Sequence, residues 1–150
     1  NNAAVIPVYH DNRVITTFKR TVKALENGQD VIIFPEKLEK RNHIVYQFQE
    51  NFVDVAKLYY KRTGKKAAFV PMYLAPRLHE LHIGKPVYFD PDTPIAEERE
   101  RICDAMAEGI TELADSLPLH TVVPYENLSP RQYHTNKPRE VTVSHEEAGC

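Results

Sequence analysis

The chain has 150 residues, of which 42% are hydrophobic and 27% are charged, and these values suit one globular domain with its own core. Its formal net charge of −2 excludes the strong basic excess of a typical nucleic-acid-binding protein, so we expect no nucleic-acid partner. No run of about 18 apolar residues occurs, so the sequence predicts no membrane-spanning helix.

The first half of the sequence predicts a strand, a helix and a second strand. Residues 3–8 form a short apolar run, which indicates a buried strand. Residues 17–27 have apolar side chains at helical spacing, and Gly28 is placed to end that helix. Residues 31–34, Val-Ile-Ile-Phe, predict a second buried strand.

The same alternation continues along the chain. Residues 51–63 predict a second amphipathic helix, and Gly64 ends it. A third strand is expected over residues 67–74, and residues 78–83 and 86–89 predict shorter extended pieces.

Thr93 is expected to cap a long helix that has Pro94 in its first turn and continues to Pro118. Residues 1–118 therefore form the predicted domain. Residues 119–150 lack periodicity, which predicts an extended or disordered tail. The sequence does not decide whether the start of this tail folds back on the domain.

Strands that alternate with helices predict an α/β domain with a mostly parallel sheet of βαβ units flanked by helices. Such sheets bind ligands beyond the carboxyl ends of their strands, so residues that follow the strands are expected to share one crevice. These residues are His10 and Arg13 after the first strand, Pro35, Glu36 and Lys37 after the second, and Pro71 near the end of the third.

Two short motifs resemble blocks of the glycerolipid acyltransferase family, the family of the 1-acylglycerol-phosphate acyltransferases. Phe34-Pro35-Glu36 follows an apolar strand and resembles the F-P-E-G-T-R-S block, and residues 67–73 resemble the later block with Val-Pro. The resemblance extends over roughly residues 3–117 and implies that family's α/β fold. Residues 47–65 are similar to a bacterial branch of the family.

The sequence also departs from the family pattern. No histidine is followed five positions later by aspartate, so the H-x-x-x-x-D block that supplies the catalytic base is missing. His10 stands where the second block has arginine, and residues 37–40, Lys-Leu-Glu-Lys, replace Gly-Thr-Arg-Ser. Either the missing block precedes Asn1 in a longer protein, which we favour, or this member is not catalytic. We expect the domain to be incomplete at its amino end and this chain to be inactive alone.

The resemblance implies an acyltransferase of glycerophospholipid biosynthesis. Such an enzyme transfers a fatty acyl group from acyl-CoA or acyl carrier protein to the hydroxyl of a lysophospholipid-type acceptor, without a cofactor. It implies a cytoplasmic protein that is peripheral at the inner face of the cell membrane and reaches the membrane through the missing portion. The alternative is a non-catalytic lipid- or anion-binding module with the same fold.

The resemblance also implies which residues form the site. Glu36 is the candidate catalytic residue, which would accept a hydrogen bond from an acceptor hydroxyl or hold a neighbouring loop N–H. The candidate substrate-binding residues are His10, Arg13, Phe34, Pro35, Lys37, Lys40 and Pro71, among which the cations suit a phosphate. A solvated surface explains the same cations without any ligand. His79 and His82 lack the spacing of a zinc motif, so no metal site is predicted.

Overall fold

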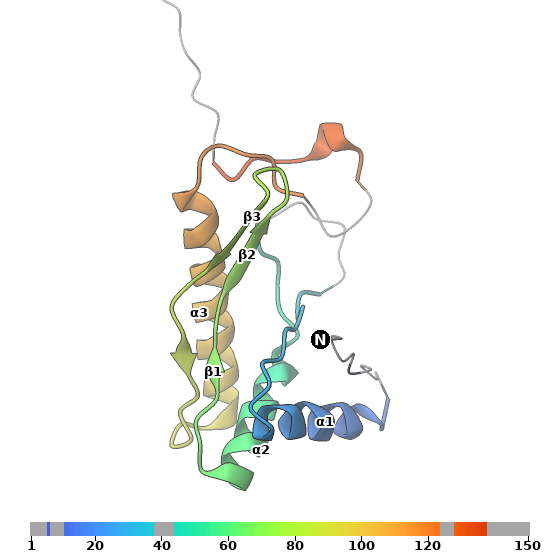
Figure 1. Ribbon diagram of the computed structural model, residues 1–150, viewed down its shortest axis with the longest axis vertical. Coiled ribbons are helices and arrows are strands. Elements are labelled where there is room, and N and C mark those ends of the chain that lie inside the picture. Colours follow the sequence, from blue (N-terminus) through green and yellow to red (C-terminus); the bar gives the residue numbers. More distant parts are fainter. Residues whose placement is uncertain (1–5, 7–10, 38–43, 124–127, 138–150) are drawn as a thin grey trace, which may run out of the picture.

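The computed structural model describes residues 6, 11–37, 44–123 and 128–137, which Figure 1 shows as a coloured ribbon. Helices dominate this part of the chain, and the strands are short. The helices are α1 (Val14–Glu26), α2 (Asp54–Thr63) and α3 (Ile95–Ser116), with 3-10 turns η1 (Glu50–Val53) and η2 (Pro130–Gln132). The strands are β1 (Ala68–Phe69), β2 (Met72–Ala75), β3 (Glu80–Ile83) and β4 (Val87–Tyr88).

The three main helices confirm the helical spacing seen in the sequence, and two of them end at the glycines that predict their ends. Gly28 has a left-handed φ of 73° after α1, where its N–H donates to the carbonyl of Leu25 and Gln29 N–H donates to that of Ala24. This is a Schellman arrangement, which favours glycine because a side chain strains the left-handed backbone. Gly64 ends α2 in the same region, at φ 68°.

The predicted parallel sheet is wrong. The strands form two separate two-stranded antiparallel sheets, in which β1 pairs with β4 and β2 pairs with β3. The chain reverses between β2 and β3 in a tight turn where His79 has a left-handed φ of 56°. A turn this short joins antiparallel strands only, because a parallel pair needs a long crossover.

The second predicted strand explains much of this error. Residues 31–34 form no regular secondary structure and lie in neither sheet, and Ile32 and Phe34 are 67% and 87% exposed. Only Glu36 pairs, in an isolated antiparallel bridge with Phe48. An apolar run predicts a buried strand only if neighbouring strands cover it, and the described residues provide none here. The first predicted strand, apart from Ile6, lies outside the described residues.

The hydrophobic core lies along α3. Near the start of this helix, Ile102 and Met106 pack with four residues of other segments. These are Phe48 before η1, Val53 of η1, Ala56 of α2 and Phe89 after β4. Near its end, Ala114 and Leu117 pack with Tyr73 and Ala75 of β2. Figure 1 shows the strands lying along α3, while α1 crosses near α2 at the other side. No helix among the described residues has the length and apolar character needed to cross a bilayer.

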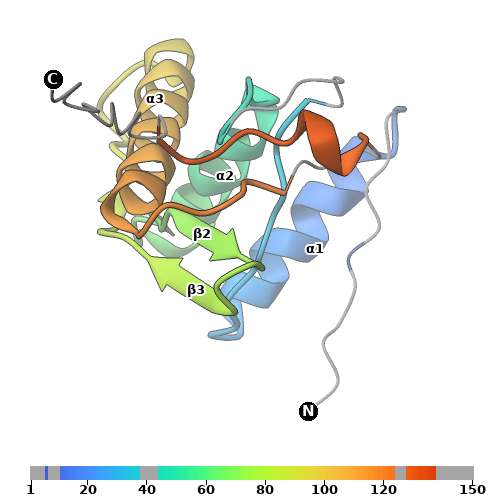
Figure 2. The same ribbon diagram turned by 90° about the horizontal axis from the view of Figure 1, so that it is seen from above.

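Part of the predicted tail packs on the domain. Residues 119–123 leave α3 and residues 128–137 return to it across one end of the molecule, joined by the Thr121–Thr135 bridge (Figure 2). The buried His120 ring contacts the Tyr73 hydroxyl at 2.7 Å from Nε2, and Nδ1 lies 2.8 Å from the Pro118 carbonyl. Because a carbonyl only accepts, Nδ1 is the donor and Nε2 accepts from Tyr73. Asn136 donates to the carbonyl of Ala114 at 2.8 Å and thereby satisfies part of the α3 terminus.

Candidate functional site

The Phe34–Lys37 segment contains four of the predicted site residues, and a short backbone pairing fixes it. Lys37 N–H donates to the Gln47 carbonyl at 2.8 Å, and Gln49 N–H donates to the Pro35 carbonyl at 2.7 Å. Phe34, Glu36 and Lys37 are exposed, while Pro35 is half-buried. The segment therefore presents an aromatic ring, a carboxylate and an ammonium group at the surface within four residues.

The Glu36 carboxylate lies in a partly desolvated position although the residue as a whole is exposed. Desolvation raises the pKa of Glu36, and the hydrogen bond from Tyr46 N–H opposes this rise. That bond is long, at 3.4 Å from Tyr46 N to Glu36 Oε2, so the carboxylate keeps most of its capacity to accept another donor. Of the two roles expected for Glu36, holding a loop N–H is the one for which a contact is present.

The other predicted residues are not gathered around Glu36. Arg13 lies at the start of α1, where its guanidinium pairs with both carboxylate oxygens of Asp11 at 2.8–3.1 Å. Pro71 is buried between β1 and β2, where it packs toward Gly84, which follows β3, and toward Gly109 of α3. Packing on a helix accounts for its position without a ligand. His10 and Lys40 lie outside the described residues, and the parallel strands that would have brought His10 toward Glu36 are absent among those described.

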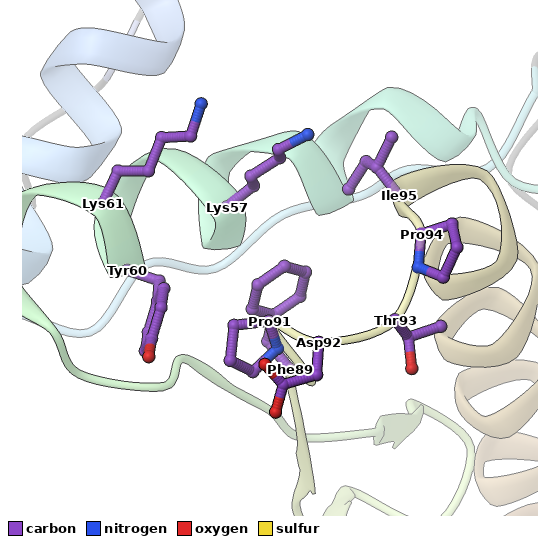
Figure 3. Close-up of a pocket in the computed structure, with 9 residues that line it drawn as sticks. All are labelled: Lys57, Tyr60, Lys61, Phe89, Pro91, Asp92, Thr93, Pro94 and Ile95. Atoms are coloured by element: carbon purple, nitrogen blue, oxygen red, sulfur yellow. The ribbon is translucent and has the colours of Figure 1, made fainter.

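A cavity of about 430 Å³ lies elsewhere, between α2 and the segment that leads from β4 into α3. This volume falls in the usual range for small-molecule sites. Its lining consists of Lys57, Tyr60 and Lys61 of α2, and Phe89, Pro91, Asp92, Thr93, Pro94 and Ile95 (Figure 3). Figure 3 shows the Lys57 and Lys61 side chains extending in one direction from α2, while the Tyr60 ring extends from its other side.

The wall of this cavity is held by carboxylates. Asp90 accepts hydrogen bonds from Asp92 N–H at 3.0 Å and from the Thr93 hydroxyl at 2.8 Å, and these two bonds lower the pKa of Asp90. Asp90 N–H in turn donates to the buried Glu98 at 2.9 Å. The prediction that Thr93 caps the long helix is wrong, because Pro94 is the N-cap residue of α3 and no side chain caps this helix. Thr93 instead fixes the loop before α3 through Asp90.

The cavity has a buried apolar floor at Phe89, and Lys57 and Lys61 lie at its edge with their ammonium groups directed away from that floor (Figure 3). Its lining contains no nucleophile next to a base. Within the described ranges, no group of three or more histidines, cysteines or acids is placed to hold a metal ion. Sequence reasoning missed this cavity, because its residues come from two regions some 30 positions apart and each region alone has an ordinary helical or turn pattern.

Comparison with protein-family models, with curated protein sequences and with solved structures finds no match to this chain.

Proposed function

We propose that the chain is a portion of an acyltransferase of glycerophospholipid biosynthesis and that Glu36 and Lys37 bind the acceptor. The observation that carries this proposal is the surface position of the Glu36 carboxylate, which has a raised pKa and is followed in the sequence by the exposed Lys37. A carboxylate accepts a hydrogen bond from a glycerol hydroxyl, and a cation attracts the phosphate of the same head group. The order of the Phe-Pro-Glu and Val-Pro motifs supports the assignment to acyl transfer.

The proposal gives this chain a binding role without turnover. Acyl transfer from a thioester to a hydroxyl needs a base within hydrogen-bond reach of that hydroxyl, and the sequence has no H-x-x-x-x-D pair to supply it. We expect no acyl-dependent release of free CoA when the chain is mixed with palmitoyl-CoA and a lysophosphatidate. Measured turnover would show that the assignment of the base is wrong.

Binding of a soluble acceptor tests the proposal directly. Titration calorimetry with a short-chain lysophosphatidate below its micellar concentration should detect binding to the wild-type chain. Glu36→Gln should weaken this binding by roughly two- to tenfold, the equivalent of one net hydrogen bond. Glu112→Gln is the matched control, since it removes an exposed carboxylate on α3. Equal affinities of the wild-type chain and Glu36→Gln would remove Glu36 from the site.

The cavity favours a second candidate, an anion-binding module without catalysis. Its lysines, Lys57 and Lys61, face solvent beside an apolar floor, which suits a ligand with an anionic group and an apolar part. In the same titration, the double variant Lys57→Gln/Lys61→Gln separates the two candidates. If this variant abolishes binding and Glu36→Gln does not, the cavity is the site and the anion-binding module is the better description.

A further inference from the structure

The β2–β3 hairpin has one face packed on α3 and one face directed away from it. Tyr73 and Ala75 occupy the packed face. On the other face Met72 pairs with Ile83 and Leu74 pairs with Leu81, because cross-strand partners share a face. We call it the outer face, and it comprises Met72, Leu74, Leu81 and Ile83.

The outer face is apolar and open. Leu74, Leu81 and Ile83 are 62%, 53% and 62% exposed, and the side chains lie next to one another through the strand register. Single exposed leucines are common, but a contiguous apolar surface usually marks an interaction site. A two-stranded sheet covered on one side only is also weakly stabilised, so an occupant of the outer face would add to its stability.

Two cations flank the hairpin. Arg77 lies in the turn between β2 and β3, Lys85 follows β3 at the other end, and both are exposed. The hairpin contains one acid, Glu80, which lies on the opposite face, since its partner is Ala75, and contacts His82 at 2.7 Å. Farther along, Lys65 and Lys66 before β1 lie at the same end of the β1–β4 pair as Asp90 and Asp92, so that end carries both signs.

We propose that the outer face docks on the surface of an anionic phospholipid bilayer. The aliphatic side chains would enter the boundary between head groups and acyl chains, and Arg77 and Lys85 would meet lipid phosphates. A second copy of the chain is a poorer occupant. Two outer faces packed together would bring cations against cations in either relative orientation, and this repulsion opposes association.

This inference rests on the proposed function, because that function predicts an acyl acceptor that resides in a membrane. It adds the surface that would bring the chain to that acceptor. The outer face contains none of Phe34, Glu36 and Lys37, so docking and acceptor binding are separable by substitution.

Vesicle co-sedimentation of the full chain tests the proposal. Wild type should partition onto vesicles of phosphatidylcholine mixed with phosphatidylglycerol, and the binding should weaken as salt rises. Leu81→Gln/Ile83→Gln should lower the partition coefficient by roughly tenfold or more, because it removes the apolar contribution. Arg77→Gln/Lys85→Gln should lower binding to the anionic vesicles and flatten its salt dependence. Both variants replace exposed side chains, and circular dichroism checks that they fold.

The matched control is Leu119→Gln/Val123→Gln, which removes two exposed apolar residues outside the hairpin and should leave vesicle binding unchanged. Absence of wild-type binding to the anionic vesicles, or an equal loss in this control, would overturn the proposal. The proposal would also be overturned if sedimentation velocity showed that wild type is a dimer and that Leu81→Gln/Ile83→Gln is a monomer. Glu112→Gln, which replaces an exposed carboxylate outside both surfaces, should keep vesicle binding. Vesicle binding without any soluble-acceptor binding would therefore refute the proposed function alone, and the reverse result would refute the docking alone.

Discussion

Cys103 and Glu36 show how the same physical effect has different consequences at single residues. Desolvation is the largest cause of a raised pKa at both. At Glu36 it moves a carboxyl group toward the pH range in which carboxylates exchange protons with substrates. At Cys103 it moves a thiol away from the range in which thiols react, since only the thiolate is a nucleophile. The same effect therefore leaves a surface carboxylate at Glu36 and an unreactive thiol at Cys103.

We predict that Cys103 reacts slowly with alkylating agents. Burial beside the core, with further contributions from Glu50 and Asp104, raises the pKa of its thiol from 9.0 to about 11. At pH 8 this lowers the thiolate fraction, and with it the alkylation rate, on the order of a hundredfold. The measurement is iodoacetamide labelling of the Cys150→Ser variant between pH 7 and 11, with free cysteine as the control. A rate that levels off near pH 9 would contradict the predicted pKa.

At the scale of elements, α3 and the extended chain before β2 meet so closely that glycine is required. A Cβ atom at Gly109 would lie 2.9 Å from Cγ of Pro71, and one at Gly84 would lie 2.8 Å from the same atom. A proline ring has little freedom to move aside. The close approach of Pro71 to α3 therefore depends on two residues without side chains, one in the helix and one after β3.

We predict that Gly109→Ala destabilises the chain by about 1–3 kcal/mol, because overpacking outweighs the better helix propensity of alanine. Urea denaturation measures the free energy of unfolding. The pair Pro71→Ala and Gly109→Ala serves as a double-mutant cycle, in which the double variant should lose less stability than the sum of the single variants. If Gly109→Ala instead stabilised the chain by about 1 kcal/mol, helix propensity would be the dominant effect and the close contact would be absent.

Elements with local causes were predictable, and elements that need distant partners were not. The helices follow from apolar spacing and from glycines such as Gly28, all within one stretch of sequence. Residues 31–34 have the composition of a buried strand, yet pairing depends on which other strands lie beside them, and periodicity contains no such information. For the same reason the sequence predicted the Phe34–Lys37 cluster, whose members are consecutive. It did not predict the cavity, which the fold assembles from α2 and the loop before α3.

For the whole molecule, an ion pair between the buried Glu98 and the exposed Arg101 joins a strand, a loop and the long helix. The fully buried Glu98 accepts from Arg101 Nη2 at 2.9 Å and from Asp90 N–H, while Arg101 also donates to the Tyr88 carbonyl at 2.8 Å. These contacts fasten β4 and the cavity wall to the first turns of α3. A buried acid is costly to desolvate, so it persists only where hydrogen bonds replace its water.

This ion pair predicts how stability depends on pH. The hydrogen bonds from Arg101, followed by that from Asp90, lower the pKa of Glu98 from its ordinary value of 4.5. The charged carboxylate therefore stabilises the folded chain above pH 4.5, and this contribution is lost as the pH falls through the lowered pKa. Glu98→Gln should reduce the free energy of unfolding at pH 7 by about 1–3 kcal/mol. The difference in the free energy of unfolding between this variant and wild type should shrink toward pH 3.

Urea denaturation at a series of pH values measures the free energy of unfolding of both proteins, with the exposed Glu97→Gln as control. Parallel curves for wild type and Glu98→Gln would show that Glu98 titrates alike in the folded and unfolded chain, since a group without a folded-state pKa shift adds no pH dependence to stability.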